Sequence, residues 1–142
     1  MNTATRWGTL IGRIFLSLIF VSSGLQKIGA WEQTAQYMAS ERMFAVPLFL
    51  AGAIVLEVLG GLSVLIGFKA RWGALALIVF LVPTTLIFHD FWTYTGQEQQ
   101  MQMIQFMKNL AILGGLFVVF GLGAGPMSVD ARSASEDAAS PS

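Results

Sequence analysis

The sequence contains no cysteine and a single histidine. The absence of cysteine excludes disulfide exchange, a thiolate nucleophile and a thiolate-ligated metal. One histidine excludes a bis-histidine haem and a histidine-rich metal site contributed by this chain. We therefore expect no metal site and no covalently bound cofactor, and the sequence assigns no catalytic residue.

Charged residues are scarce as well. They make up 11% of the chain, against 55% hydrophobic residues, and the mean hydropathy is +0.67. A soluble domain has roughly a quarter of its residues charged, so this chain has too little polar surface to cover a water-facing fold. Basic and acidic residues balance at 8 each, without a basic cluster among the aromatics, which argues against a nucleic-acid partner. The composition predicts a protein embedded in the lipid bilayer.

Four segments are apolar over the roughly 20 residues that a helix needs to cross the hydrocarbon core. They span residues 7–28, 46–68, 71–88 and 104–122. The 4 tryptophans all stand at the ends of these segments, where amphipathic rings meet lipid headgroups. The sequence thus predicts an all-α fold, a four-helix transmembrane bundle over residues 1–127.

The first apolar segment resembles a signal peptide only superficially. Arg13 interrupts its start, it exceeds the 7–15 residues of a signal-peptide core, and no clear cleavage site follows. We therefore expect a retained helix. The short turn between the second and third segments holds Lys69 and Arg71 without an acidic residue, and this bias favours both chain ends in the cytoplasm.

Two segments outside the spans are predicted to differ in structure. Residues 128–142 are small, polar and poor in apolar side chains, so we predict a disordered cytoplasmic tail. Residues 31–44 place Trp31, Ala35 and Met38 near one helical face. A short interfacial helix and an ordinary loop are equally compatible with this segment.

Ionisable residues inside a span cost roughly 2.5–3.5 kcal/mol each at mid-helix, so those that occur should face the bundle interior and have a partner. Glu57 shares its helix face with the small residues Ala53, Gly60 and Gly61, which predicts that it points inward. Arg13 is expected within roughly 6 Å of the same depth. We predict an Arg13–Glu57 ion pair, which could either fix helix register or supply a titratable carboxyl for proton relay or ligand binding.

Polar and aromatic residues near the outer ends of the first, third and fourth spans are predicted to converge on one ligand pocket. The candidates are Lys27, His89, Asp90, Phe91, Trp92, Gln105, Lys108 and Asn109. Pro83, inside the third span, should free a backbone carbonyl nearby. Two simpler roles stay open, since Lys27 could extend to the interface and His89 could cap a helix end.

Glycines recur at spacings that allow helices to approach closely. Gly8 and Gly12 are four residues apart, and Gly114 and Gly115 lie inside the fourth span. None follows a predicted strand, so packing within the bundle is favoured over phosphate binding.

Several ordered motifs together resemble the DoxX family of small bacterial membrane proteins. They cover roughly residues 6–130 and include Ser23–Lys27, Glu57–Leu62, His89–Trp92, Phe106–Ala111 and Gly125–Asp130. The resemblance implies four membrane helices in a bacterial inner membrane. Members of the family are tied to a quinol oxidase, to thiosulfate–quinone oxidoreduction and to oxidative-stress complexes.

Two functions are compatible with these features. A redox-linked membrane subunit would bind a quinone in the outer pocket, with Glu57 relaying a proton. Because the chain has no haem, flavin or metal motif, it could not transfer electrons alone, and this role requires either a redox protein partner or a quinone that acts as the electron carrier. The alternative is a non-catalytic scaffold, assembly factor or small-solute passage, and homo-oligomerisation is compatible with both. An open cavity beside His89 and Lys108 would favour ligand binding, whereas a solid, fully paired core would favour the scaffold.

Overall fold

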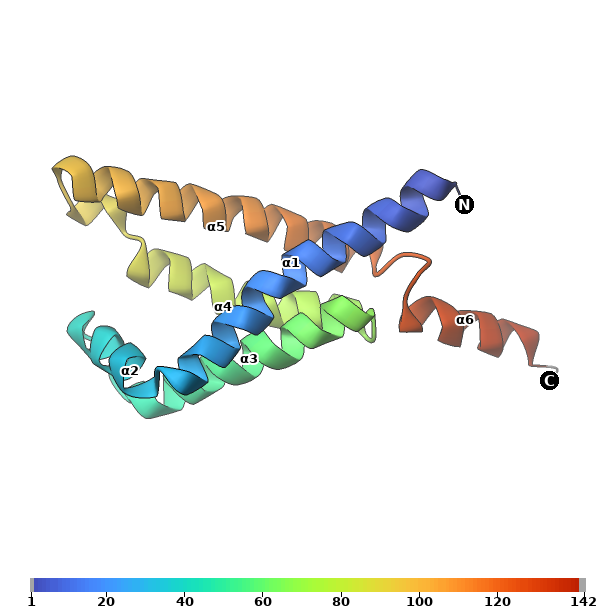
Figure 1. The fold of residues 1–142 in the computed structure, drawn as a ribbon, viewed down its shortest axis with the longest axis horizontal. Coiled ribbons are helices and arrows are strands. Elements are labelled where there is room, and N and C mark those ends of the chain that lie inside the picture. The colour runs from blue at the N-terminus through green and yellow to red at the C-terminus, as the bar shows by residue number, and fades with distance from the viewer. Residues whose placement is uncertain (1, 141–142) are drawn as a thin grey trace.

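The computed structural model describes residues 2–140, and its elements are helices joined by short connections. In chain order these are α1 (Thr3–Gly29), α2 (Trp31–Ser40), α3 (Val46–Ile66), α4 (Ala70–Phe88), the 3₁₀ helix η1 (Phe91–Thr93), α5 (Gly96–Leu122) and α6 (Val129–Ala139) (Figure 1). Helices α1, α3, α4 and α5 are each long and apolar enough to cross a membrane. The predicted all-α fold with four membrane helices is therefore confirmed.

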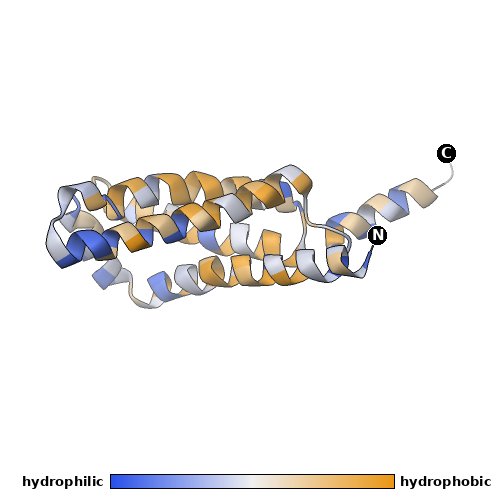
Figure 2. Ribbon diagram, turned by 90° about the horizontal axis from the view of Figure 1, so that it is seen from above, coloured by the Kyte–Doolittle hydropathy of each residue, from blue (hydrophilic) through white to orange (hydrophobic). Residues whose placement is uncertain are grey.

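The four long helices pack mainly in chain order. Helix α1 contacts α3, α3 contacts α4, and α4 contacts α5, whereas α1 and α5 touch only slightly (Figure 1). Helix α2 and η1 lie at one end of the bundle, which we call the α2 end, and α6 projects from the other, the α6 end. Apolar residues dominate the long helices and hydrophilic residues gather toward the ends (Figure 2), as expected for a bilayer-spanning bundle.

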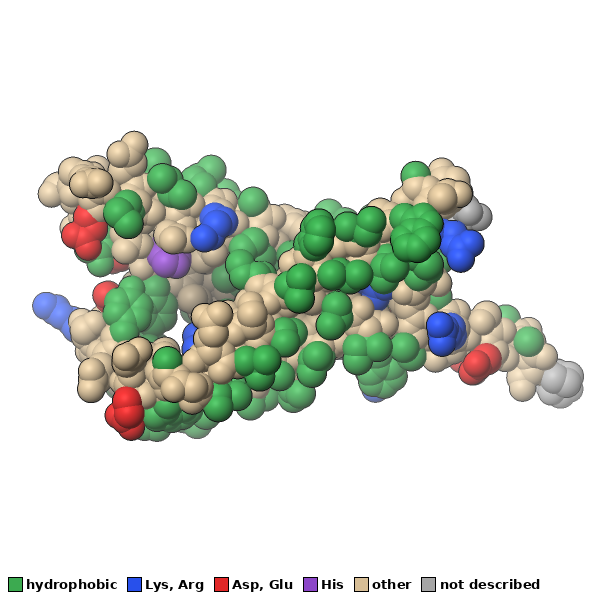
Figure 3. Space-filling view, in the orientation of Figure 1, with side chains coloured by type: hydrophobic (Ala, Val, Ile, Leu, Met, Phe, Trp, Pro, Cys, Tyr) green, Lys and Arg blue, Asp and Glu red, His purple; other side chains and the backbone are tan. Residues whose placement is uncertain are grey.

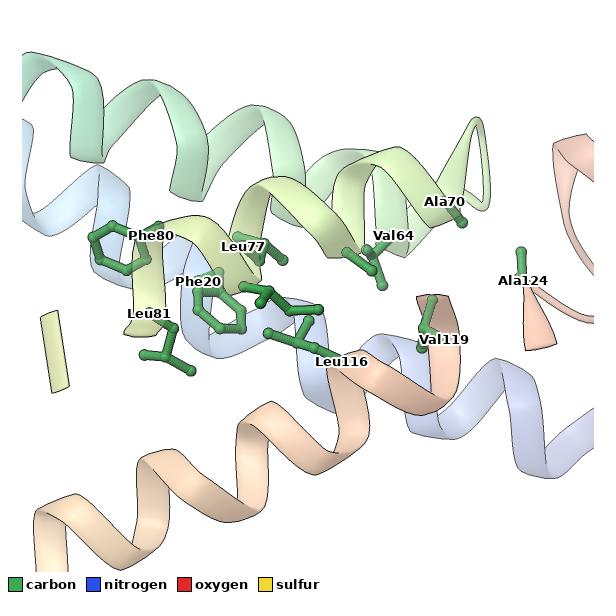
Figure 4. Packing of buried hydrophobic residues seen from close by; sticks show 11 residues of the cluster. Phe20, Val64, Ala70, Leu77, Phe80, Leu81, Leu116, Val119 and Ala124 are labelled. Carbon is green, nitrogen blue, oxygen red and sulfur yellow. The ribbon is translucent and has the colours of Figure 1, made fainter. Parts of the chain in front are cut away.

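The core lies where α1, α3, α4 and α5 meet (Figure 4). Val64, Leu77 and Leu116 are fully buried there. Phe20 and Phe80 pack edge to face, with ring centroids 6.5 Å apart, a favoured geometry for aromatic pairs. Most other large apolar side chains of the long helices point outward, where lipid replaces the protein core.

Close helix approach depends on the small residues beside Glu57. A Cβ atom on Gly61 would lie 2.7 Å from Cγ2 of Val21, and one on Gly60 would lie 3.0 Å from Cγ of Leu77. Gly61 therefore sets the α1–α3 contact and Gly60 the α3–α4 contact. This confirms that the face of α3 carrying Glu57 meets other helices.

Of the remaining glycines predicted to pack against another helix, one does so in the structure. Gly115 faces Leu16 of α1, which is packing of the predicted kind. Among residues 2–140, Gly8, Gly12 and Gly114 have no atom of another segment near the position that a Cβ would occupy. Their predicted packing is not made within this chain, because α1 and α5 diverge.

Residues 31–40 form the helix α2, so the helical alternative holds for that part of the segment 31–44, and its place at the membrane interface stays a prediction. The C-terminal segment also differs from its prediction as a disordered tail, since the structure has the helix α6 over Val129–Ala139. Residues 141–142 of the predicted tail lie outside the described residues. Ser128 caps α6 by accepting a hydrogen bond from the Ala131 amide at 3.2 Å. Asp130 accepts hydrogen bonds from the amides of Lys69 and Ala70, at 2.7 and 3.0 Å. Hydrogen bonds to the α3–α4 turn, and not apolar burial, hold the start of this helix in place.

Candidate functional site

A buried ion pair joins the middle of α3 to the last turn of α1. The Lys27 ammonium donates a hydrogen bond to Oε1 of Glu57 at 3.0 Å and lies 2.9 Å from Oε2. It also donates to the Ser23 hydroxyl at 2.6 Å. The Glu57 side chain is 2% exposed and that of Lys27 is 24% exposed, so the carboxylate depends on this lysine for its counter-charge.

The predicted Arg13–Glu57 pair is wrong. Gly24 lies level with Glu57, since a Cβ on Gly24 would be 3.2 Å from the Glu57 Cβ. Arg13 is three turns earlier in α1, about 16 Å along the axis, which is beyond the reach of its side chain. Lys27 is one turn from Gly24 on the same face and takes the place predicted for Arg13.

Arg13 instead binds backbone carbonyls at the α6 end. Its guanidinium donates to the Val64 and Leu65 carbonyls at 3.2 and 3.3 Å and also to the Met127 carbonyl. The last carbonyls of a helix lack intrahelical donors, and Val64 and Leu65 are within the last three residues of α3. Arg13 thus joins α1, the end of α3 and the segment leading to α6.

A cavity of 930 Å³ opens between α2, α3 and α4 at the α2 end, and Figure 3 shows the molecule hollowed there beside its histidine. The wall is largely apolar. Apolar lining residues include Met38, Phe44, Phe49, Leu50, Leu56, Val79, Phe80, Pro83, Ile87 and Phe88. A volume in the range of small-molecule sites, with few polar groups, is typical of a pocket for an apolar or amphipathic ligand.

Two ionisable groups from the membrane helices line this cavity, Lys27 and His89. His89 Nδ1 lies 2.9 Å from Oε1 of Gln102. Because a carbonyl oxygen only accepts, Nδ1 is the donor in this contact, an arrangement that in a neutral ring leaves Nε2 as the acceptor. Pro83 has no amide hydrogen, so the carbonyl of Val79, one turn earlier in the same wall, loses its usual helical donor. The cavity therefore offers a cation and acceptors within an apolar wall.

The loop that follows α2 adds polar groups at the same cavity. Glu41 and Arg42 line it together with Tyr37. Burial, and then the charge of Glu41, raise the pKa of Tyr37 above its usual value. The charge of Glu41 is the main cause of the raised pKa of Tyr94. Both phenols stay neutral at physiological pH and remain hydrogen-bond donors.

The structure does not bring the eight predicted pocket residues into one site. Lys27 and His89 share the cavity, whereas Gln105 and Lys108 are exposed on α5. Asn109 is buried and donates to the Thr85 hydroxyl at 3.1 Å. The reason is that α4, and not α5, forms the cavity wall opposite α3. Residues of α5 at the same membrane depth as His89 therefore do not line the cavity.

The three residues after His89 also lie outside the cavity wall. The Thr93 hydroxyl donates to the carboxylate of Asp90 at 3.1 Å. Phe91 and Trp92 pack against each other and against Phe106 of α5, with ring centroids 5.3 to 6.2 Å apart. These aromatics anchor η1 to α5.

Sequence reasoning missed the wall formed by α2 and the first turns of α3. Met38, Phe44 and Phe49 belong to it. Met38 is the buried residue of α2, and its placement on the apolar face of residues 31–44 was the available signal. Within residues 2–140, no three His, Asp or Glu side chains are grouped closely enough to hold a metal ion.

The four long apolar helices, the buried ion pair and the apolar cavity define a small multi-pass membrane protein with a ligand-sized pocket. The chain belongs to the DoxX family, which matches residues 8–90. The SURF4 family also matches, over residues 51–134.

Curated relatives agree with this assignment. The chain is 35% identical over 123 residues to the inner membrane proteins YphA and YqjF of Escherichia coli, covering 87% of this chain and 88% and 89% of those proteins. It is 25% identical over 131 residues to the Surfeit locus protein 4 homolog of Drosophila melanogaster, covering 91% of this chain and 42% of that protein. No solved structure matches the chain. It is accordingly a DoxX-family, multi-pass inner membrane protein.

Proposed function

We propose that this protein is a redox-linked membrane subunit that binds a quinone in the cavity at the α2 end. The observation that carries the proposal is the cavity itself: 930 Å³, an apolar wall, and Lys27 and His89 in that wall. A quinone has the matching chemistry, with an apolar tail, a flat ring and two carbonyl acceptors.

The wall residues have separate roles in this proposal. Phe44, Phe49 and Phe88 surround the ring and tail, and Lys27 donates to a ring carbonyl. Neutral His89 accepts a hydrogen bond from the hydroxyl of the reduced, quinol form. Glu57, held by Lys27, tunes the charge next to the ring and relays protons.

Reduction of a quinone to a quinol consumes two electrons and two protons. The sequence has no haem, flavin or metal motif, so the electrons must be exchanged with a redox protein partner. In this proposal the chain supplies the lipid-level binding site and proton-accepting groups, and the partner supplies the redox centre. The proposal places both chain ends in the cytoplasm.

The test is equilibrium binding of a short-tailed ubiquinol analogue, kept in the reduced form, to the purified protein in detergent. We expect saturable binding by wild type and a loss of about tenfold or more in affinity in His89→Ala, the factor that corresponds to one hydrogen bond of about 1.4 kcal/mol. Lys108→Ala is the matched control, since Lys108 is exposed on α5 and does not line the cavity.

A second pair of variants tests the cavity without changing charge. Gly52 lines it and Gly114 does not, and neither has an atom near the Cβ position. Gly52→Phe should block the quinone, whereas Gly114→Phe should leave binding unchanged. If folded wild type does not bind the quinol analogue, or both glycine variants bind equally, the proposal fails and the scaffold role is favoured.

A further inference from the structure

A second cavity lies at the α6 end, far from the quinone site proposed above. It has a volume of 570 Å³ and is formed by the start of α4, the end of α5 and the segment entering α6. Its lining includes two basic side chains, Lys69 and Arg71, and two large apolar ones, Trp72 and Leu122. The cavity thus combines cationic groups with a surface that faces hydrocarbon.

Two basic side chains line this cavity against one acidic side chain, that of Asp130. Neither side chain makes a hydrogen bond or an ion pair with another residue in the range 2–140. The nearby carboxylate is that of Asp130, and its two oxygens accept hydrogen bonds from the backbone amides of Lys69 and Ala70. The Asp130 carboxylate is therefore hydrogen-bonded to the backbone at the start of α4. The side chains of Lys69 and Arg71 remain available to an external anion.

The Arg71 side chain lies beside the backbone at the end of α5. Gly123 has φ +87°, and a Cβ atom there would lie 3.5 Å from Nε of Arg71. Glycine at this point lets the chain turn away from α5 while the guanidinium lies beside it. Arg71 consequently lies at the end of α5, in the lining of the cavity.

Two apolar residues of the cavity, Trp72 and Leu122, indicate the chemistry of a ligand beside the basic side chains. Trp72 is 71% exposed and Leu122 is 81% exposed. Tryptophan at a span end sits at the headgroup level, and leucine beside it faces the acyl chains. A ligand that fits carries a negative phosphate at the membrane surface and hydrocarbon just below it.

We propose that this cavity binds the headgroup of an anionic phospholipid, with Lys69 and Arg71 contacting the phosphate oxygens and with Trp72 and Leu122 beside the acyl chains. Basic pockets between membrane helices recognise acidic lipid headgroups in this way. Because the segment joining α5 to α6 forms one wall, the bound lipid also stabilises the docked position of α6.

The test measures thermal unfolding of the full chain in a neutral detergent, with added phosphatidylglycerol or with phosphatidylcholine of the same acyl chains. We expect a concentration-dependent rise in Tm with phosphatidylglycerol and a much smaller rise with phosphatidylcholine. Each basic residue near an anionic lipid contributes on the order of a fivefold factor. The apparent affinity should therefore fall roughly 25-fold in the Lys69→Gln/Arg71→Gln double variant.

Arg132→Gln is the matched control, because Arg132 is exposed on α6 and does not line the cavity. It should keep the wild-type response. Native mass spectrometry of wild type supplies a measurement independent of the variants, with preferential retention of phosphatidylglycerol expected.

Three results would overturn the proposal. One is equal stabilisation by the two lipids, and another is an unchanged phosphatidylglycerol response in the double variant. The third is the same Tm rise with inorganic phosphate at matched ionic strength, which would identify a free-anion site. Quinone binding at the α2 end is not affected by any of these outcomes.

Discussion

Lys27 Nζ lies between both carboxylate oxygens of Glu57 and the hydroxyl of Ser23, at 2.6 to 3.0 Å. This arrangement fixes the last turn of α1 against the middle of α3. It also places a charge pair at the base of the larger cavity, since Lys27 lines that cavity. Stability and the proposed quinone site therefore share one residue, and mutations of the pair must be interpreted with both in mind.

Removing one member of the pair should cost more than removing both. In Lys27→Met the carboxylate of Glu57, 2% exposed, is left unpaired, and we expect the free energy of unfolding to fall by about 3–5 kcal/mol. Glu57→Gln should cost less because Lys27 is partly exposed and can reach water. Unfolding in mixed micelles, followed by circular dichroism, measures each value.

The double variant Lys27→Met/Glu57→Gln gives the decisive comparison. It removes both charges, so we expect it to be more stable than Lys27→Met alone. Simple addition of the two single losses would show that the residues are not coupled, in conflict with the observed geometry.

Arg13→Met should destabilise the protein and release the segment that leads to α6. The substitution leaves the Val64, Leu65 and Met127 carbonyls without their charged donor, at a cost of about 2–4 kcal/mol. Limited proteolysis should then cleave residues 127–139 faster than in wild type. Arg6→Met is the control, because Arg6 is exposed. Equal cleavage of the two variants would argue against a role of Arg13 in holding this segment.

Glycine substitutions should separate packed from open positions. A Cβ on Gly61 would meet Val21 at 2.7 Å, whereas Gly114 has open space. Gly61→Ala should lower the free energy of unfolding by about 1–3 kcal/mol through overpacking. Gly114→Ala should be neutral or slightly stabilising in the same assay, and a loss equal to that of Gly61→Ala would place a contact at Gly114 that this bundle does not show.

Membrane orientation can be measured directly because the natural sequence has no cysteine. Gln97→Cys and Ser135→Cys introduce single thiols at exposed positions near the two ends of the bundle. If both chain ends are cytoplasmic, an impermeant maleimide should label Gln97→Cys in intact cells. Ser135→Cys should be labelled only after the cells are permeabilised. The reverse pattern would invert the predicted topology.

The sequence by itself determined the membrane class, the number of spans and most of their limits within a few residues; the exception is the fourth, predicted from residue 104, whose helix α5 begins at Gly96. These follow from apolar length, tryptophan placement and the scarcity of charge, all of which are local properties that the bilayer selects directly. The inward direction of Glu57 was also predictable, because neighbouring small residues on a helix face are visible in the spacing.

The tertiary structure alone decided which residues meet. Counting residues from the membrane surface along each span predicted that Glu57 pairs with Arg13. The register between α1 and α3 is set where Gly61 meets Val21, and it places Lys27 beside Glu57 instead. The same limitation merged residues of α4 and α5 into one pocket, although α2, α3 and α4 enclose the cavity. Spacing along a helix fixes the face of a residue, whereas register and the order of helices around the bundle depend on contacts between distant segments.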